Sequence, residues 1–185
     1  MSRIRIVTAF MSETLPKRKH PRLKHFDYSQ NMRYFITICT HKKRCILSSV
    51  RVGRGLAPAE THKTAVGQVI ERTLLEMPKR YPYLIIDKYV VMPNHIHVIF
   101  GILAPAGASP RPTISDIVCA FKSLSTRECK STQLIDNKLW QTSFYDHIIR
   151  NETDYRAIWE YIDTNPTRWA DDKYYSEGAA ALMNT

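Results

Sequence analysis

The strongest constraint on the fold is a run of alternating side chains, HIHVIFG, that begins at His95. In an extended strand, successive side chains point to opposite faces. His95 and His97 therefore share one face, and the apolar side chains that alternate with them occupy the other. A second strand-like segment, residues 83–92, precedes this run across a tight Pro-Asn turn. Together they predict an antiparallel hairpin with one apolar face and one face that carries two imidazoles.

Helical periodicity is found on both sides of this hairpin. Apolar residues recur at helical spacing over residues 64–77, and Pro78 is expected to end that helix. Thr113 begins a second helix with a capping-box pattern. Asn151 is a favourable N-cap for a third helix, which Pro166 is expected to end. The chain therefore combines three predicted helices with the hairpin.

The order of the elements indicates the fold class. A strand over residues 33–40 comes first, and residues 48–62 are predicted to be a surface loop or insertion. The order strand, helix, hairpin, helix, helix predicts an α+β fold, an antiparallel β-sheet with helices packed on one face, near the split β-α-β pattern. We expect three parts: a basic arm over residues 1–31, one domain over residues 32–170, and a C-terminal tail over residues 171–185.

Charge narrows the choice of partner. The 185 residues include 27 Lys and Arg against 17 Asp and Glu, a net charge of +10. This excess favours a polyanion, either nucleic acid or an anionic membrane surface. No apolar run reaches the roughly 20 residues that cross a bilayer, and the four cysteines have no zinc-ligand spacing. We therefore expect a cytoplasmic protein with reduced thiols that binds nucleic acid and no membrane.

The N-terminal segment has features of its own. Residues 4–10 are too short, and too interrupted by Arg5, for a signal peptide. Because residues 11–12 repeat the opening Met-Ser pair, we expect translation to begin naturally at Met11.

Basic residues occur in clusters that can follow a phosphate backbone. Three aromatic residues, Trp140, Phe144 and Tyr145, can stack exposed bases of a single strand. Taken singly, each of these residues has an ordinary explanation as a surface cation or a packed ring. The candidate cations are Lys17, Arg18, Lys19, Arg22 and Lys24 in the arm, Lys42, Lys43 and Arg44 after the first strand, and Lys122 and Arg127 on the second helix.

The histidine pair is a candidate site for one divalent cation. Two histidines at this spacing also occur by chance on a half-exposed strand, so the pair alone leaves both explanations open. A third ligand must come from another element. Tyr161 and Asn165 lie four residues apart on the third helix and therefore share a face. Because a following proline disfavours the helical conformation, Asn165 is expected at a frayed helix end, free to turn toward a metal.

Each of these two residues also has an ordinary explanation. A tyrosine at a helix flank usually packs its ring and exposes its hydroxyl, and an Asn-Pro pair usually ends a helix. The combination with a same-face histidine pair is what favours a functional site.

Several ordered blocks resemble a known family. The HIH triplet is similar to the HUH motif, in which U is a hydrophobic residue. FDYSQNMRYFITICTHKKRCIL, YVVMPNHIHVIF, ISDIVCAFKS, LWQTSFYDHIIRNETDY and YIDTNPTRW together resemble the REP-associated tyrosine transposases, relatives of the insertion-sequence single-tyrosine transposases. The resemblance extends from about Lys24 to Trp169, and it does not account for residues 48–62 or the N-terminal extension.

The resemblance implies a fold, a chemistry and a substrate. It implies a ferredoxin-like or RRM-like HUH endonuclease fold that cleaves and rejoins single-stranded DNA through a 5′-phosphotyrosine. His95, His97 and Asn165 would hold Mg²⁺ or Mn²⁺, and Tyr161 would be the nucleophile. The substrate would be DNA hairpins of repetitive extragenic palindromes, bound by a monomer or a homodimer.

Two observations support this chemistry, and two alternatives remain. No nucleotide cofactor is expected, because exchange of one phosphodiester for another roughly conserves bond energy and the chain has no phosphate-loop motif. Among the other tyrosines, Tyr145 and Tyr155 have no polar ligand candidate four residues later, and Tyr174 and Tyr175 lie in the tail. The alternatives are another HUH enzyme, such as a replication initiator or relaxase, and a non-catalytic regulator that binds hairpin nucleic acid.

Overall fold

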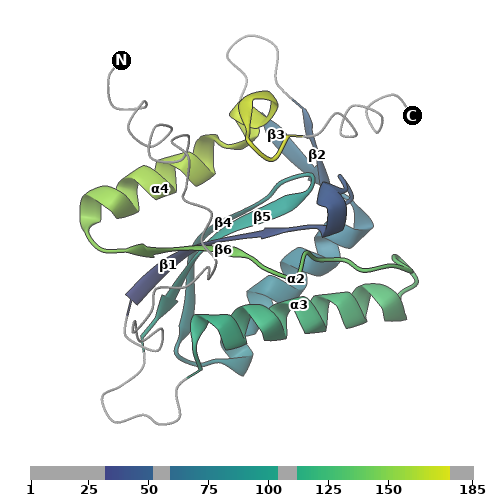
Figure 1. The fold of residues 1–185 in the computed structure, drawn as a ribbon, viewed down its shortest axis with the longest axis horizontal. Helices are drawn as coiled ribbons and strands as arrows, with labels where there is room; N and C mark the ends of the chain where they lie inside the picture. Colours follow the sequence, from purple (N-terminus) through teal and green to yellow (C-terminus); the bar gives the residue numbers. More distant parts are fainter. Residues whose placement is uncertain (1–31, 52–58, 104–111, 176–185) are drawn as a thin grey trace.

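A four-stranded antiparallel sheet forms the centre of the computed structural model, which describes residues 32–51, 59–103 and 112–175 (Figure 1). The strand order is β4-β5-β1-β6. The strands are β1 (Met32–Cys39), β4 (Leu84–Val91), β5 (His95–Ile102) and β6 (Tyr145–Ile149). The predicted hairpin is confirmed as β4 and β5, and β1 lies beside β5 along its whole length.

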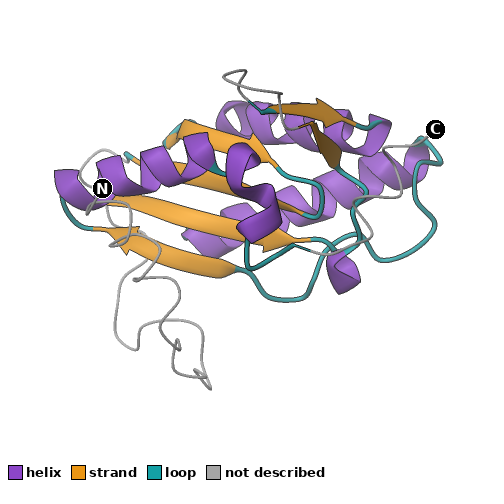
Figure 2. Ribbon diagram, turned by 90° about the horizontal axis from the view of Figure 1, so that it is seen from above, coloured by secondary structure: helices purple, strands orange, loops and turns teal. Residues whose placement is uncertain are grey.

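Helices cover both faces of this sheet. Helices α2 (Ala65–Arg80) and α3 (Ile114–Ser131) pack on one face, over a core that includes Phe100 and Phe121. Helix α4 (Glu152–Thr164) packs on the other face. Figures 1 and 2 show the sheet between these two helical layers. The α+β fold with an antiparallel sheet is confirmed, and the expectation that all helices share one face is corrected for α4.

The strands themselves explain the position of α4. Alternate residues of β1 and β5 face opposite layers, and both sets are apolar enough to need cover. Phe35 and Ile99 are fully buried on the side away from α2 and α3. Helix α4 supplies that cover with Ile158 and Ile162. The histidine face of β5 is therefore an interior surface.

The helix starts agree with the predictions from the sequence, but the end of α2 does not. The Thr113 capping box is present, and the Asn151 side chain accepts a hydrogen bond from the backbone N–H of Asp154. The prediction that Pro78 ends its helix was wrong, because α2 continues to Arg80. The backbone N–H of Tyr81 donates to the carbonyl of Met77 at 2.9 Å, so the last turn closes past the proline.

The segment predicted as a loop over residues 48–62 contains a second, two-stranded sheet. Its strands are β2 (Ser48–Arg51) and β3 (Glu60–Lys63), which pair antiparallel, so that prediction was wrong for these residues. Residues 52–58 between the strands lie outside the described part of the chain. The same is true of residues 1–31, with the five candidate cations of the arm and the expected start at Met11.

Within residues 32–51, 59–103 and 112–175, no helix combines the length and the apolar character that crossing a bilayer requires.

Candidate functional site

The two histidines lie side by side in the interior, on the face of β5 that α4 covers. His95 and His97 are fully buried, and their Nε2 atoms are 3.0 Å apart. Burial, together with the smaller effect of the Lys173 and Lys43 ammonium groups, lowers the pKa of His95 to about 3. Burial also lowers the pKa of His97 well below 6.5, with a further contribution from His95. Both imidazoles are therefore neutral at pH 7, the state in which histidine binds a metal.

Neighbouring side chains fix the orientation of both rings. The amide oxygen of Asn94 accepts a hydrogen bond from Nδ1 of His95 at 2.8 Å, which leaves Nε2 of that ring with a lone pair. Nδ1 of His97 lies 2.8 Å from the hydroxyl of Thr37, its register partner on β1. Because a hydroxyl can accept or donate, His97 can take either tautomer there. Such partners on the far nitrogen are typical of histidines that hold a metal.

Tyr161 reaches the histidine pair from α4. Its hydroxyl oxygen lies 3.4 Å from Nε2 of His97 and donates to Oδ2 of Asp172, also at 3.4 Å. Its ring packs at a right angle to that of Phe35, with ring centroids 5.9 Å apart. Burial raises the pKa of Tyr161 well above 10, and the Asp172 carboxylate raises it further. The phenol is held rigidly and in its protonated form.

Asn165 is placed at the same site, but in a different conformation from the one expected. It is buried and helical, with φ −57° and ψ −42°, so the expectation of a frayed end was wrong. Pro166 begins a 3₁₀ helix, η2 (Pro166–Asp171), and the chain keeps turning through Asn165. Its side-chain nitrogen donates to Asp172 Oδ2 at 2.8 Å, and its side-chain oxygen is buried with no hydrogen-bond partner among the described residues.

Asp172 is the member of the site that the sequence did not reveal. It belongs to the segment predicted as a C-terminal tail, and within the described part of that segment Asp172 and Tyr174 lie against the histidines. The ligand atoms of His95, His97 and Asp172 lie within 4.8 Å of one another. Trp169 anchors η2 in a buried cluster, which brings the following residues onto the sheet. The sequence shows only a tryptophan three residues before Asp172, which does not by itself indicate this contact.

Tyr174 also reaches the site from this segment. Its ring centroid lies 4.7 Å from that of His95, and burial raises the pKa of its phenol well above 10. The place of Tyr174 in the predicted tail is therefore no reason to set it aside. Tyr155 contacts Arg33 and Trp159 at the outer part of α4.

The donor set fits a divalent cation. It combines two neutral imidazoles, one carboxylate and one buried amide oxygen without a partner, all ordinary ligands of such ions. A buried polar atom without a partner costs free energy, and a bound cation would remove that cost at Asn165. Within the described part of the chain, His95, His97, Asp172 and Asn165 are the candidate metal ligands.

The candidate DNA-binding residues differ in their exposure and in their contacts. Lys42 is exposed, and the Lys43 ammonium lies 5.3 Å from the ring of Tyr174. The Arg44 guanidinium donates to a backbone carbonyl, that of Lys138. Trp140 is 3% exposed and its indole N–H donates to Ser125, so the expectation that it stacks exposed bases was wrong. Phe144 and Tyr145 are partly buried in the two cores.

Comparison with known proteins places the chain in a family. Residues 59–165 match the sequence model of the IS200-like transposases. An uncharacterized protein of Haemophilus influenzae is 31% identical over 175 residues, which cover 85% of this chain and 93% of that protein. The chain therefore belongs to the IS200-like transposase family.

Two further comparisons find more distant similarities. A REP-associated tyrosine transposase of Escherichia coli is 27% identical over 101 residues, 55% of this chain and 54% of that protein. The structure of a REP-associated tyrosine transposase bound to a REP hairpin superposes with a TM-score of 0.57 at 23% identity, covering 80% of this chain and 73% of that one. The latter comparison supports the α+β fold with its four-stranded antiparallel sheet.

Proposed function

We propose that this protein cleaves and rejoins single-stranded DNA through a covalent bond between Tyr161 and a 5′ phosphate. The observation that carries the proposal is the position of the Tyr161 hydroxyl, 3.4 Å from both His97 Nε2 and Asp172 Oδ2. Membership of the IS200-like transposase family supports the same reaction class. The hairpin in the related solved structure suggests REP-type DNA hairpins as substrate.

The roles follow from the positions of the side chains. Tyr161 Oη attacks the scissile phosphorus, and the bond from phosphorus to the 3′ oxygen breaks. The released 3′ oxygen takes a proton from water, so that the strand leaves with a 3′ hydroxyl. Asp172 accepts the phenol proton as attack proceeds, because its carboxylate already receives that hydrogen bond. Rejoining is the reverse, with a 3′ hydroxyl as the incoming group. The site supplies alignment, since the ring of Tyr161 is clamped against Phe35.

His95, His97, Asp172 and Asn165 would hold the cation, which we propose to be Mg²⁺ or Mn²⁺. A cation bound there would supply charge stabilisation to a non-bridging phosphate oxygen. Thr37 and Asn94 keep the two imidazoles oriented, and burial keeps them neutral. The carboxylate and amide oxygens favour hard cations, while the imidazoles extend the range toward transition metals.

Trapping the covalent intermediate tests the proposal. A 5′-labelled DNA hairpin with a single-stranded flank is incubated with protein and Mn²⁺, then denatured and run on a gel. The 5′ label reports the released fragment. In a parallel reaction the DNA is labelled at its 3′ end, and wild-type protein should give a labelled adduct, because the fragment on the 3′ side of the cut stays bound to Tyr161. Tyr161→Phe should give none, because it lacks the nucleophilic oxygen.

Two control variants make the result specific. Tyr174→Phe keeps the ring that packs on His95 and should still form the adduct. Tyr155→Phe, on the same helix as Tyr161 but near Arg33, should do the same. An adduct that survives in Tyr161→Phe and disappears in Tyr174→Phe would assign the nucleophile to Tyr174. A wild type that binds the hairpin and forms no adduct on any DNA would instead support the non-catalytic regulator.

A further inference from the structure

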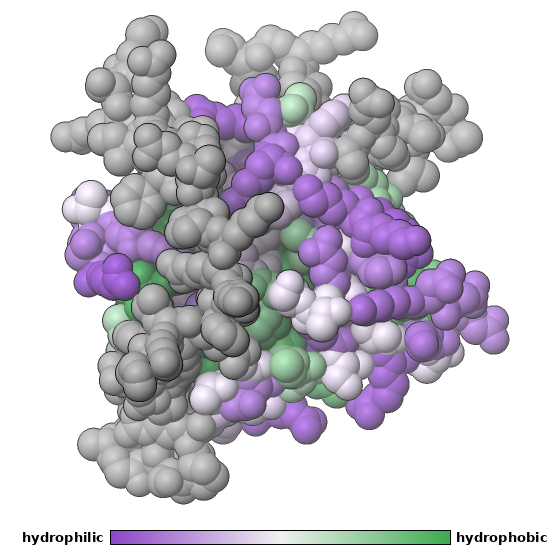
Figure 3. Space-filling view, in the orientation of Figure 1, coloured by the Kyte–Doolittle hydropathy of each residue, from purple (hydrophilic) through white to green (hydrophobic). Residues whose placement is uncertain are grey.

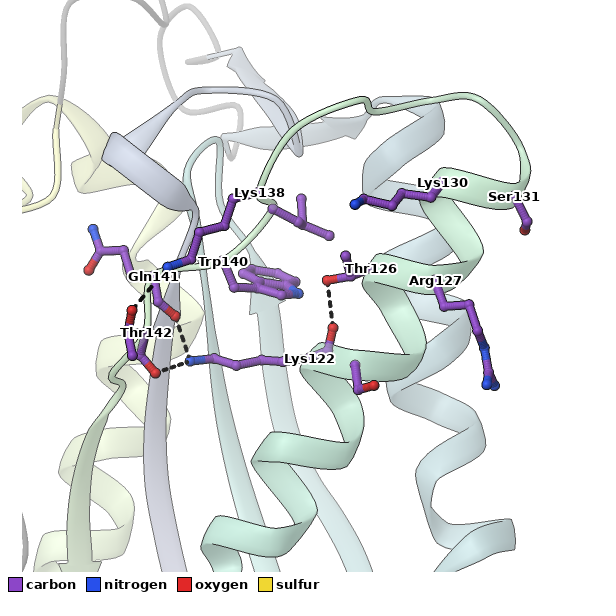
Figure 4. A pocket seen from close by; sticks show the side chains of 11 residues that line it. Lys122, Thr126, Arg127, Lys130, Ser131, Lys138, Trp140, Gln141 and Thr142 are labelled. Atoms are coloured by element: carbon purple, nitrogen blue, oxygen red, sulfur yellow. Dashed lines mark hydrogen bonds between the residues drawn. The ribbon is translucent and has the colours of Figure 1, made fainter.

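A positive charge that assists the proposed reaction must lie on the face of the sheet that carries the histidines. Hydrophilic side chains dominate the surface where α3 ends (Figure 3), but α3 covers the opposite face. There the ammonium of Lys122 donates to the three consecutive backbone carbonyls of residues 141–143, at 2.9, 3.3 and 3.0 Å (Figure 4). The prediction that Lys122 follows phosphates is therefore revised, because its ammonium positions the segment that leads into β6.

Lys173 lies beside the histidine site, in the segment that follows η2. Its ammonium nitrogen is 5.0 Å from the ring centroid of Tyr174 and 5.3 Å from that of Tyr145. The Tyr174 ring lies against His95, and the Tyr145 ring packs against Phe35, with centroids 6.3 Å apart. Phe35 is also the ring on which the proposed nucleophile packs. The Lys173 ammonium therefore lies over the aromatic residues that surround the candidate site.

Lys43 reaches the same segment from the turn that follows β1. It is the last residue of the 3₁₀ helix η1 (His41–Lys43). Its ammonium donates to the backbone carbonyl of Lys173 at 3.4 Å and lies 5.3 Å from the ring centroid of Tyr174. Both ammonium groups contribute to the lowered pKa of His95, which agrees with their position beside the histidines. Two positive charges thus lie next to the candidate metal ligands.

The Lys173 ammonium is accessible to an anionic ligand. Lys173 is exposed, and among the described residues its ammonium contacts these two rings rather than a carboxylate. A lysine over an aromatic ring at an exposed position is held weakly. A phosphate oxygen accepts a charge-assisted hydrogen bond from the same group, which is the stronger contact. A DNA phosphate that enters the site can therefore draw the Lys173 ammonium away from the rings.

The proposed reaction develops negative charge that a further cation can stabilise. Attack by the Tyr161 oxygen spreads charge over the non-bridging oxygens of the scissile phosphate and onto the departing 3′ oxygen. The candidate metal ligands contribute one carboxylate, Asp172, and no positive charge of their own, because both histidines are neutral. A preorganised donor aimed at developing charge typically raises a rate on the order of 100- to 1,000-fold. Lys173, which follows Asp172 in the chain, supplies such a cation.

We propose that Lys173 is a catalytic residue, whose ammonium binds a non-bridging oxygen of the scissile phosphate during attack by Tyr161. The inference rests on the proposed function, which it deepens by adding a substrate contact that neither the histidine pair nor α4 supplies. Lys173 keeps its proton throughout, so only its charge takes part, and the electron pairs move as described for Tyr161. Lys43 is a positioning residue, since its hydrogen bond to the Lys173 carbonyl holds this segment beside the histidines.

The rate of adduct formation in a single turnover tests this inference. Excess protein, Mn²⁺ and hairpin DNA with a single-stranded flank are mixed, and the adduct is quantified over time at several protein concentrations. Lys173→Met keeps the aliphatic stem and should lower the maximal rate on the order of 100-fold. The protein concentration that gives half of that rate should change by no more than about 5-fold, the effect of one lost phosphate contact at about 0.1 M salt. Lys173→Arg keeps the charge and should restore most of the rate.

A control and a second measurement separate catalysis from folding. Lys79→Met removes the same charge at an exposed position of α2, on the other face of the sheet, and should change neither quantity. Lys173→Met should bind Mn²⁺ at least as tightly as the wild type in calorimetry, because a positive charge beside the ligands is gone. A wild-type rate in Lys173→Met overturns the inference, and so does weaker Mn²⁺ binding, which would show that Lys173 only holds Asp172 in place. A wild type that forms no adduct on any DNA would instead refute the proposed function, and this inference with it.

Discussion

Acidification should lower the stability of this protein through the histidine pair. The unfolded chain binds a proton on His95 near its ordinary pKa of 6.5, while the folded protein keeps that pKa at about 3. Between these values the unfolded state binds more protons, so stability is present above pH 6.5 and is lost as the pH falls. For His95 alone, the loss between pH 7 and pH 5 is about 2 kcal/mol. His97 shifts in the same direction and adds to it.

Urea unfolding of the metal-free protein measures this loss. With a slope of about 2 kcal/mol per molar urea, the midpoint should fall by roughly 1 M or more between pH 7 and pH 5. This window stays above the ordinary carboxyl pKa values of about 4. His95→Gln should reduce the pH dependence by about 2 kcal/mol, and His62→Gln, at an exposed histidine, should not change it. A wild-type midpoint that stays constant across this range would refute the reasoning.

Three substitutions test other parts of the structure. Asp172→Asn should weaken Mn²⁺ binding, measured by calorimetry, at least about 10-fold, whereas Asp163→Asn, at an exposed carboxylate on α4, should not. Lys122→Met should cost about 2 kcal/mol in urea unfolding, because three backbone carbonyls lose a charged donor, and Lys130→Met should cost almost nothing. Gly67→Ala would place a Cβ 1.9 Å from the Leu47 carbonyl oxygen and should cost at least about 2 kcal/mol; Gln68→Ala should stay within about 0.5 kcal/mol. If a variant and its control change the measured quantity equally, the contact that the variant removes does not make the stated contribution.

The parts of the fold that the sequence predicts are those fixed by local chemistry. The alternation from His95 to Phe100 sets the two faces of β5, and the caps at Thr113 and Asn151 form as expected. The errors arise where tertiary contacts overrule a local preference. Packing of α2 carries the helix past Pro78, and pairing of two short strands orders residues 48–51 and 60–63. Neither contact is visible within a short window of sequence.

The residues of the candidate site also divide into those that the local sequence predicts and those that depend on tertiary contacts. Tyr161 and Asn165 could be paired from the sequence because four residues on a helix bring two side chains onto one face. Asp172 could not, because it reaches Tyr161 across eleven residues only after η2 has turned the chain back onto the sheet. The buried Trp169 fixes that turn, and its packing against Val50 and Met92 joins segments far apart in the sequence.

In the proposed reaction, the charge of this site would link metal binding to DNA binding. Both imidazoles are neutral, so Asp172 contributes the one negative charge among the described candidate ligands, and Lys173 offsets it nearby. A DNA phosphate adds a further negative charge in a buried setting, where uncompensated charge is costly. A bound divalent cation removes that cost, so Mn²⁺ should tighten binding of the cleavage strand. By linkage, DNA should tighten binding of Mn²⁺ by the same factor. Calorimetric titration of Mn²⁺ into Tyr161→Phe protein, with and without an unpaired strand, measures this coupling, and equal Mn²⁺ affinities in the two titrations would show that the phosphate does not approach these ligands.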